Sequence, residues 1–127
     1  MAGQVGYIAG TASVVSNLSV SNTNATITSQ PLSPGVWIIS YQLSVTTNSG
    51  YVQAWLTVGG SLASSQSNTN ATNGYTFTNN NTYTSICSTI AYTVTSGTPT
   101  ATVIGQSSTG SSSVYTGGTF ITCIRVA

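Results

Sequence analysis

The chain has 127 residues and a single charged side chain, Arg125, since Asp, Glu, His and Lys are all absent. General acid–base catalysis and a complete metal site therefore lack the residues that they need, and we expect neither an enzyme nor a bound cofactor. Nucleic acid and membrane surfaces are also excluded as partners, because no basic cluster exists to attract phosphate groups.

The hydrophobic fraction is 39%, which is ordinary for a folded protein, and Ser, Thr, Asn and Gly fill most of the remainder. No run of about 18 apolar residues occurs, so no membrane-spanning segment is predicted. Residues 1–12 lack both a basic region and a continuous apolar run, and we expect no signal peptide there. A chain with almost no charge has little colloidal repulsion, which favours association with copies of itself or with a larger particle.

Short strands are predicted first along the chain, over residues 4–9, 12–20 and 25–28. We expect one domain over residues 1–127, in which residues 1–24 form an N-terminal arm and the first strands. The next strand is the one around which we expect the rest of the chain to be organised. It follows the turn signal of Pro34 and Gly35.

Residues 35–45 alternate with a period of two, as a strand does when one face is buried. The predicted core face carries Trp37, Ile39, Tyr41, Leu43 and Val45. The other face begins with Val36 and Ile38, so the strand is apolar on both sides at its start. Such a strand is expected in a sheet that is covered on both faces, by a second sheet and by a partner subunit.

A turn at residues 46–50 and a strand at 51–58 follow. In that strand Tyr51 and Trp55 oppose a face of smaller apolar residues, and Gly59 with Gly60 predicts a hairpin turn. Residues 61–74 are either a weak edge strand or an exposed loop.

A second long strand is predicted over residues 82–95, then a turn at 96–99, a strand at 100–106, a Ser/Gly-rich loop at 107–118 and a last strand at 119–126. Short strands between turn signals, with no helical period, indicate an all-β protein of about eight to ten strands, folded as a two-sheet sandwich or jelly roll. An immunoglobulin-like sandwich is the rival, but both cysteines follow Trp37 and Trp55, which breaks its Cys-Trp-Cys order.

Three stretches resemble the C1q/TNF-like jelly-roll domain, especially the type found in viral and phage structural proteins. The first stretch begins at Pro34 and consists of a turn, a Gly-x-Trp triplet and an alternating strand. The second is the strand-turn-strand of residues 93–108. The third is the ending GGTFITCIRVA of residues 117–127. The resemblance covers roughly residue 25 onward.

The resemblance implies a homotrimer in which the outer face of one sheet packs around a threefold axis. The implied interface residues are Val36, Ile38, Cys87, Ala91, Ile121, Cys123 and Arg125. The implied core residues are Trp37, Ile39, Tyr41, Leu43, Ile90, Tyr92, Phe120 and Ile124.

Two cysteines permit one disulfide, but their number does not show whether that disulfide forms. In the family order the central strand lies between the strands of Cys87 and Cys123, which implies a separation of roughly 10 Å. That distance exceeds the reach of a disulfide, so the resemblance favours two buried thiols. Arg125 would lie near the axis, with the carboxylate of Ala127 as its only available anion.

The function implied is that of a non-enzymatic virion surface protein: a fibre head, decoration protein or minor capsid protein that associates with itself and with other virion or capsid proteins. Its Ser/Asn/Gly loops, at residues 61–74, 78–82 and 107–118, would form the exposed surface.

Two alternatives remain. One is a subunit of an extracellular filament that polymerises by strand exchange. The other is a carbohydrate-binding module that takes a cell-surface glycan on Tyr51, Trp55 and Tyr75, although Tyr and Trp are also common as half-buried strand residues.

Overall fold

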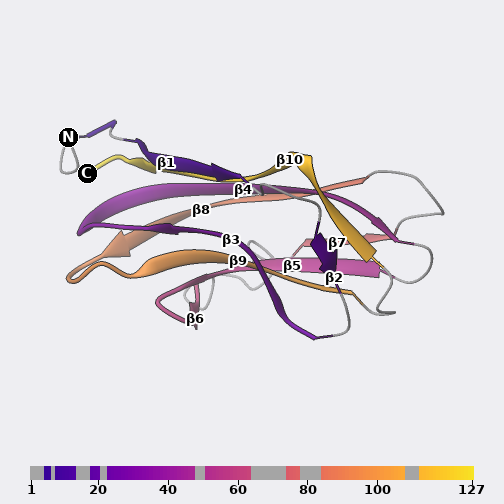
Figure 1. Ribbon diagram of the computed structural model, residues 1–127. Coiled ribbons are helices and arrows are strands. Elements are labelled where there is room, and N and C mark those ends of the chain that lie inside the picture. The colour runs from indigo at the N-terminus through magenta and orange to yellow at the C-terminus, as the bar shows by residue number, and fades with distance from the viewer. Residues whose placement is uncertain are drawn as a thin grey trace.

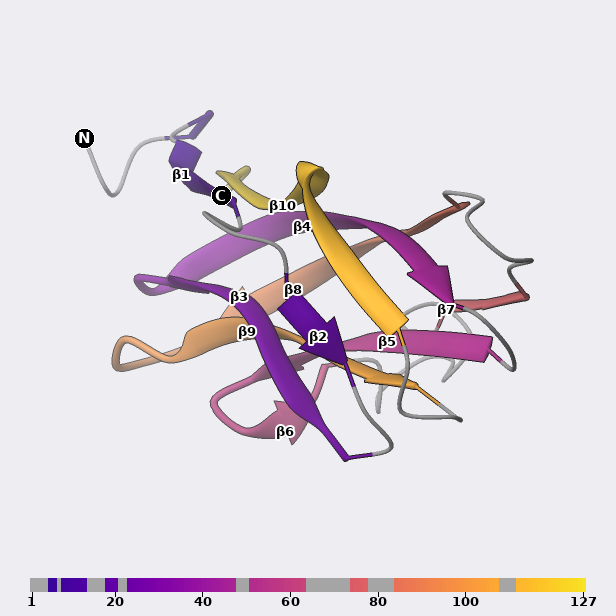
Figure 2. The same cartoon turned by 45° about the vertical axis from the view of Figure 1, so that its right-hand side comes forward.

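The computed structural model describes residues 5–6, 8–13, 18–20, 23–47, 51–63, 74–77, 84–107 and 112–127. They form two antiparallel sheets that pack face to face as a sandwich (Figure 1). The turned view in Figure 2 shows the same two layers, with strongly twisted strands. This architecture confirms the predicted all-β jelly-roll sandwich. None of the described residues forms a helix that is long and apolar enough to cross a membrane.

The first sheet has the strand order β1-β10-β4-β8, and β2 pairs with the other end of β10. Its strands are β1 (Ile8–Ser13), β2 (Leu18–Val20), β4 (Gly35–Thr47), β8 (Thr84–Val94) and β10 (Ser112–Arg125). The second sheet has the order β3-β9-β5-β6, and β7 also pairs with β5. Its strands are β3 (Ala25–Pro31), β5 (Tyr51–Val58), β6 (Ser61–Leu62), β7 (Gly74–Phe77) and β9 (Thr100–Ser107).

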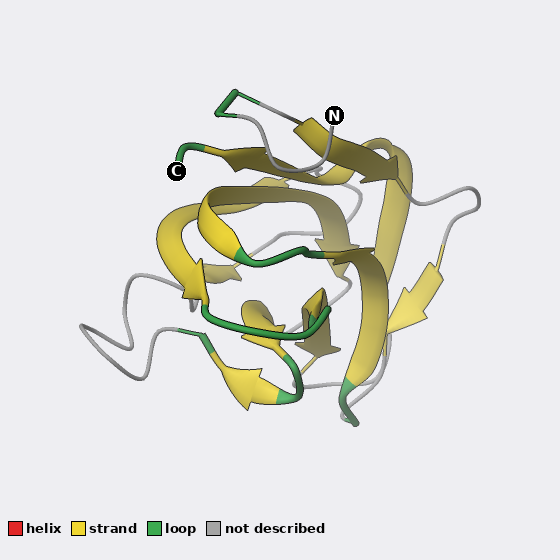
Figure 3. Cartoon of the chain, turned by 90° about the vertical axis from the view of Figure 1, so that its left-hand side faces the viewer, coloured by secondary structure: helices red, strands yellow, loops and turns green. Residues whose placement is uncertain are grey.

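The core lies between the inner faces of the two sheets, which enclose it when the sandwich is seen end-on (Figure 3). β4 supplies the predicted face, and all five of its inward residues are at most 2% exposed: Trp37, Ile39, Tyr41, Leu43 and Val45. The second sheet contributes alternate residues of β5 and β9 to the core, which include Val52, Ala54, Leu56, Val58, Ala101 and Val103. The predicted core residues Ile90 and Tyr92 are partly buried and pack against this cluster.

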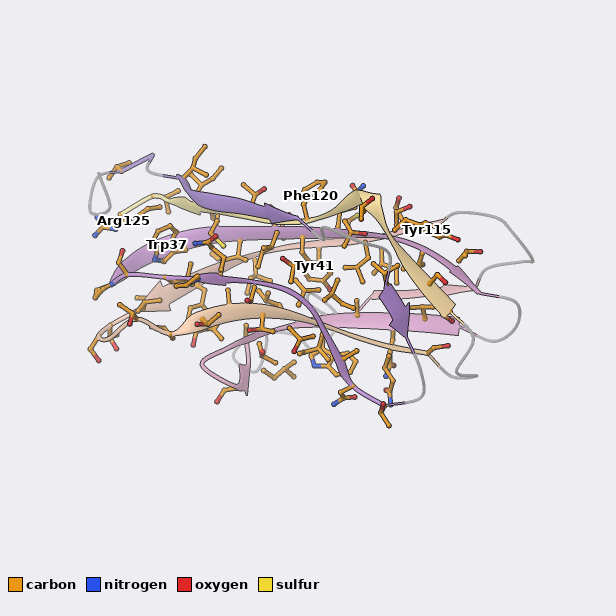
Figure 4. All side chains as sticks on the ribbon, in the orientation of Figure 1. Trp37, Tyr41, Tyr115, Phe120 and Arg125 are labelled. Atoms are coloured by element: carbon orange, nitrogen blue, oxygen red, sulfur yellow. The ribbon has the colours of Figure 1, made fainter. Side chains whose placement is uncertain are left out.

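Two hydrogen bonds satisfy the polar atoms of the large core aromatics. The hydroxyl of Tyr41 donates across the core to the carbonyl oxygen of Ala54 in the second sheet, at 3.2 Å. The indole nitrogen of Trp37 donates to the carbonyl oxygen of Ser33, at 2.9 Å. Both side chains can therefore be buried without leaving an unpaired donor. Figure 4 shows the two aromatics along the layer between the sheets.

The prediction for β10 was wrong about which face is inward. Ile121 and Cys123 are fully buried, opposite Tyr41 and Ile39 of β4, whereas Phe120 and Ile124 are half-exposed on the outer face. Both faces of this segment are apolar, so alternation by itself does not choose between them.

Arg125, which was assigned to the interface face with Ile121 and Cys123, lies opposite Trp37 at the end of the strand. Both side chains lie at the same end of the sandwich (Figure 4). The Nε of Arg125 is buried there, and the strand keeps the inward parity of Ile121 and Cys123.

The predicted loop at residues 107–118 is also wrong in its second half, because β10 begins at Ser112. Val114 is fully buried opposite Val45, and the hydroxyls of Ser107 and Ser112 form a buried hydrogen bond of 2.6 Å. The pairing with β4 shifts between Tyr115 and Phe120, so the extra residues form a bulge around Gly117 and Gly118.

Side chains from β4 and β10 close this bulge. The backbone N–H of Ser44 donates to the hydroxyl of Thr119, and the amide of Gln42 donates to the carbonyl of Gly118, at 3.0 and 3.1 Å. The Gly pair therefore interrupts the pairing without ending the strand.

The remaining differences concern the edges. A strand was expected over residues 4–9, and the structure has β1 at Ile8–Ser13; of the predicted strand 12–20, residues 12–13 belong to β1 and residues 18–20 to β2. The Gly59-Gly60 turn is confirmed, with φ of +60° and +82°. Of the predicted surface loops, residues 64–73 and 78–82 lie outside the described residues.

We expect Gly35→Ala to destabilise the protein by about 2–4 kcal/mol, measured by chemical denaturation. Gly35 has φ of +146°, and an added Cβ would overlap with Nε of Arg125 and lie 2.7 Å from the carbonyl oxygen of Ala127. Gly117→Ala is the matched control, because nothing lies within 4 Å of its added Cβ. Equal stability of the two variants would contradict this account of Gly35.

Candidate functional site

The outer face of the second sheet contains an open depression of about 620 Å³. It lies over β5 and β9, where the outward residues of β5 alternate with the buried ones. Its lining residues are Asn24, Gln53, Trp55, Thr57, Gly60, Leu62 and Ile104. The depression is therefore built on two regular, neighbouring strands and on the hairpin that follows β5.

Among the described residues that line the depression, Trp55 is the one aromatic residue, and it is half-buried. Ile104 lies directly opposite it on β9, in a cross-strand pair whose side chains share the outer face. The turn of Gly59 and Gly60 reverses the chain so that Leu62 pairs with Thr57. Both glycines have positive φ, the conformation that a tight two-residue hairpin requires. An indole thus lies between two aliphatic side chains on a fixed backbone.

Amide and hydroxyl groups flank the indole. The amide nitrogen of Gln53 donates to the amide oxygen of Gln106, its cross-strand partner, at 2.5 Å. The hydroxyl of Thr57 donates to the backbone carbonyl of Thr102, at 3.4 Å. Because each amide carries both donor and acceptor atoms, this face offers both kinds of hydrogen bond to a ligand.

None of the described residues that line this depression is titratable, and the chain's one charged side chain, Arg125, belongs to the other sheet. The strongly shifted groups lie in the core of the sandwich instead. Burial raises the pKa of the Cys123 thiol to about 12. Burial, and to a smaller extent Cys87, also raises the pKa of Tyr41. Neither group can ionise near neutral pH, and neither lies on the outer face.

Of the three residues proposed for glycan stacking, Trp55 lines the depression. Tyr75 pairs with Gln53 and Tyr51 pairs with Phe77 in the backbone register of β5 and β7, while the side chains of both tyrosines lie outside the described part of the structure. Sequence reasoning missed the other lining residues. The parity of Gln53 and Thr57 with Trp55 was an available signal, but the contribution of Ile104 depends on the β5–β9 register.

The residues proposed for a trimer interface are divided between two places. Val36, Ile38, Cys87 and Ala91 lie on the outer face of the first sheet, as predicted, and are half-buried or exposed. Ile121 and Cys123 are buried in the core, where they cannot contact a partner. Arg125 faces the end of the core, and its Nε is buried with no hydrogen-bond partner in the structure. The predicted interface therefore loses its β10 residues.

The thiols do not pair, and β4 lies between their strands as predicted. The expectation of two buried thiols is wrong for Cys87, which is exposed, whereas Cys123 is buried. The inward parity of Cys123 and the outward parity of Cys87 place them on opposite faces of the sheet.

No family model and no curated protein matches the sequence. Solved structures do match the fold. The CBM36-1 domain of a multidomain xylanase, from the hindgut metagenome of Trinervitermes trinervoides, aligns with a TM-score of 0.53 at 11% identity, over 93% of this chain and 87% of that chain.

The C-terminal CBM6 of LamC, a marine laminarinase from Zobellia galactanivorans, aligns with a TM-score of 0.35 at 12% identity, over 91% of this chain and 100% of that chain. At 11% identity the first of these alignments shows a likeness of fold alone.

The core pKa shifts predict a stability profile that is flat from about pH 4 to 8 and falls in alkali. In the unfolded chain a thiol ionises near pH 8.5 to 9, whereas folded Cys123 keeps its proton until about pH 12. Between these values the unfolded state binds fewer protons, so the free energy of unfolding decreases by up to about 1.4 kcal/mol per pH unit from this group. Denaturation at pH 7 to 10.5 measures it.

The controls for this profile are Cys123→Ala and Cys87→Ser. The first removes the buried thiol and should flatten the slope between pH 8.5 and 10. The second removes the exposed thiol and should keep that slope. If the free energy of unfolding falls with pH equally in Cys123→Ala and in the parent protein, Cys123 is not the group responsible.

Proposed function

We propose that this protein binds neutral carbohydrate on the outer face of its second sheet, with the indole of Trp55 as the stacking surface. The observation that carries the proposal is the placement of Trp55 in an open depression beside amide and hydroxyl groups and without any charge. A sugar ring has an apolar C–H face and a rim of hydroxyls, which match an indole and its flanking amides.

The absence of charge selects the class of sugar. A uronic acid or a sulfated sugar carries a negative charge, and that charge would lose hydrating water on binding. This is unfavourable because the face has no cation to pair with the charge. The only charged side chain, Arg125, belongs to β10 of the other sheet. A neutral sugar exchanges hydrogen bonds with water for hydrogen bonds with Gln53 and its neighbours at little cost.

The shape of the depression favours an internal segment of a glycan over its end. The depression is open to solvent instead of enclosed, so a glycan chain is not required to end at the ring that lies on Trp55. The structural likeness to a domain described as a CBM36 supports this proposal at the level of fold, since one fold carries many functions. Binding without catalysis agrees with a sequence that has no His, Asp, Glu or Lys to act as general acid or base.

The trimeric virion protein suggested by the C1q/TNF-like resemblance stays a prediction, as does its place on a virion surface. Four of its proposed interface residues lie on the outer face of the first sheet, whereas Ile121 and Cys123 are buried in the core. The filament alternative likewise stays a prediction, because residues 1–4 and 14–17 lie outside the described residues. The intact depression on the second sheet is why we favour glycan binding.

Trp55→Ala should weaken binding to a neutral polysaccharide at least tenfold, a change of about 1.4 kcal/mol, because the stacking surface is lost. Affinity electrophoresis in gels that contain xylan, β-glucan or galactomannan, followed by calorimetry on the best ligand, measures it. Trp55→Tyr should retain part of the affinity, since a phenol ring also stacks.

Phe120→Ala is the matched control, because Phe120 is a half-buried aromatic on the outer face of the other sheet. It should bind like the parent protein. If no neutral glycan is retained in any gel, or if Trp55→Ala binds like the parent protein, the proposed site is wrong.

A further inference from the structure

The edges of the two sheets differ in how they are protected against pairing with another strand. An unprotected edge exposes backbone N–H and C=O groups, and natural proteins interrupt it by shortness, charge, Pro or a bulge. In the described structure, β2, β6 and β7 have only three, two and four residues. β1 and β3 each carry a register shift, and β3 also ends in Pro31.

β8 has none of these protections. Its 11 residues contain no Pro, Gly or charged side chain. Every residue from Thr84 to Val94 pairs with β4 in one continuous register. Among the described residues no strand pairs with the other edge of β8. About half of its backbone polar groups therefore point away from β4 along a straight, regular edge.

The outward side chains of β8 are also small enough for another strand to lie beside it. Its outward residues are all small and exposed: Ser85, Cys87, Thr89, Ala91 and Thr93. The inward residues Ile86 and Val94 are buried, and Ile90 and Tyr92 are partly buried, so the strand is held firmly on the core. Among the described residues, the outward side chains of β8 itself place no large or charged group in the way of a second strand.

We propose that β8 pairs antiparallel with β8 of a second copy of this chain, which joins the first sheets of two molecules into one continuous sheet. An antiparallel strand pair has twofold symmetry, so one sequence satisfies both sides and the contact closes after two copies. Centring the pair on Thr89 overlaps all 11 residues and brings Ala91 opposite Cys87 of the partner subunit. A formal net charge of only +1 gives little repulsion between the two molecules.

The glycan-binding face is not used in this contact. Trp55 and its neighbours belong to the outer face of the second sheet, whereas the proposed contact uses an edge of the first. A dimer would carry two such faces on a single rigid body and bind a repeating polymer by two contacts at once. The dimer itself does not depend on the proposed function.

Light scattering coupled to size exclusion, over a range of protein concentrations, tests the proposal. The expected mass is twice 12.9 kDa. Ala91→Lys should weaken the dimer at least tenfold, because it places a charge on the paired edge of each copy. Ser29→Lys is the matched control: Ser29 is exposed on the β3 edge of the other sheet, and this variant should stay dimeric.

Disulfide trapping tests the register. In a Cys87→Ser background, Thr89→Cys should give a disulfide-linked dimer on mild oxidation, because opposed residues of antiparallel strands have Cα atoms within disulfide range. Ser29→Cys in the same background should not. A monomer or a trimer at millimolar concentration overturns the proposal. So does a dimer that resists Ala91→Lys and fails to form the Thr89→Cys crosslink.

Discussion

The packing of β4 between two neighbours and above the second sheet is the constraint on which the rest of the structure depends. β4 pairs along its length with β8 on one side and with β10 on the other, and its inward residues from Trp37 to Val45 are almost completely buried. The hydroxyl of Tyr41 reaches the carbonyl of Ala54 on β5, so the central strand is tied to the second sheet by a directional contact as well as by apolar packing. The same strand positions the bulge of β10 through Gln42 and Ser44.

A nearly uncharged sequence makes this packing the main source of stability. No ion pair between side chains is available, because Arg125 is the only charged one. Folding must therefore rest on apolar burial and on hydrogen bonds between neutral groups. The two outer faces of the sandwich differ in chemistry. On the first sheet Ile8, Ile38 and Ile124 lie opposite one another across three strands, whereas the second sheet presents Trp55 among amides and hydroxyls.

Much of the fold could be predicted from the sequence, because alternation and turn signals are local. The face of β4, the limits of β5 and the Gly59-Gly60 turn all follow from such signals. The faces of β10 could not be chosen, since Phe120 and Ile124 on one side and Ile121 and Cys123 on the other are equally apolar. The start of β10 was missed because its Ser- and Gly-rich segment has the composition of a loop, and only the register with Val45 shows that Val114 is in the core.

Only the central residue of the candidate site was predicted from the sequence. Trp55 stands out in sequence because it is a large aromatic on the polar face of its strand. Its neighbour Ile104 is 49 positions away and joins the site through pairing between β5 and β9, which no local pattern records. Leu62 and Thr57 could be placed together once the hairpin turn was recognised.

The two tryptophans provide the most direct test of the claim that the second sheet is the binding face. Each indole N–H gives one signal in a nitrogen–proton correlation spectrum, and that of Trp37 is bonded to Ser33 within the core. Titration with a neutral oligosaccharide should move the Trp55 indole signal and the side-chain amide signals of Gln53 and Gln106, while the Trp37 signal stays in place. Movement confined to residues of the first sheet, such as Phe120 and Ile124, would contradict the account.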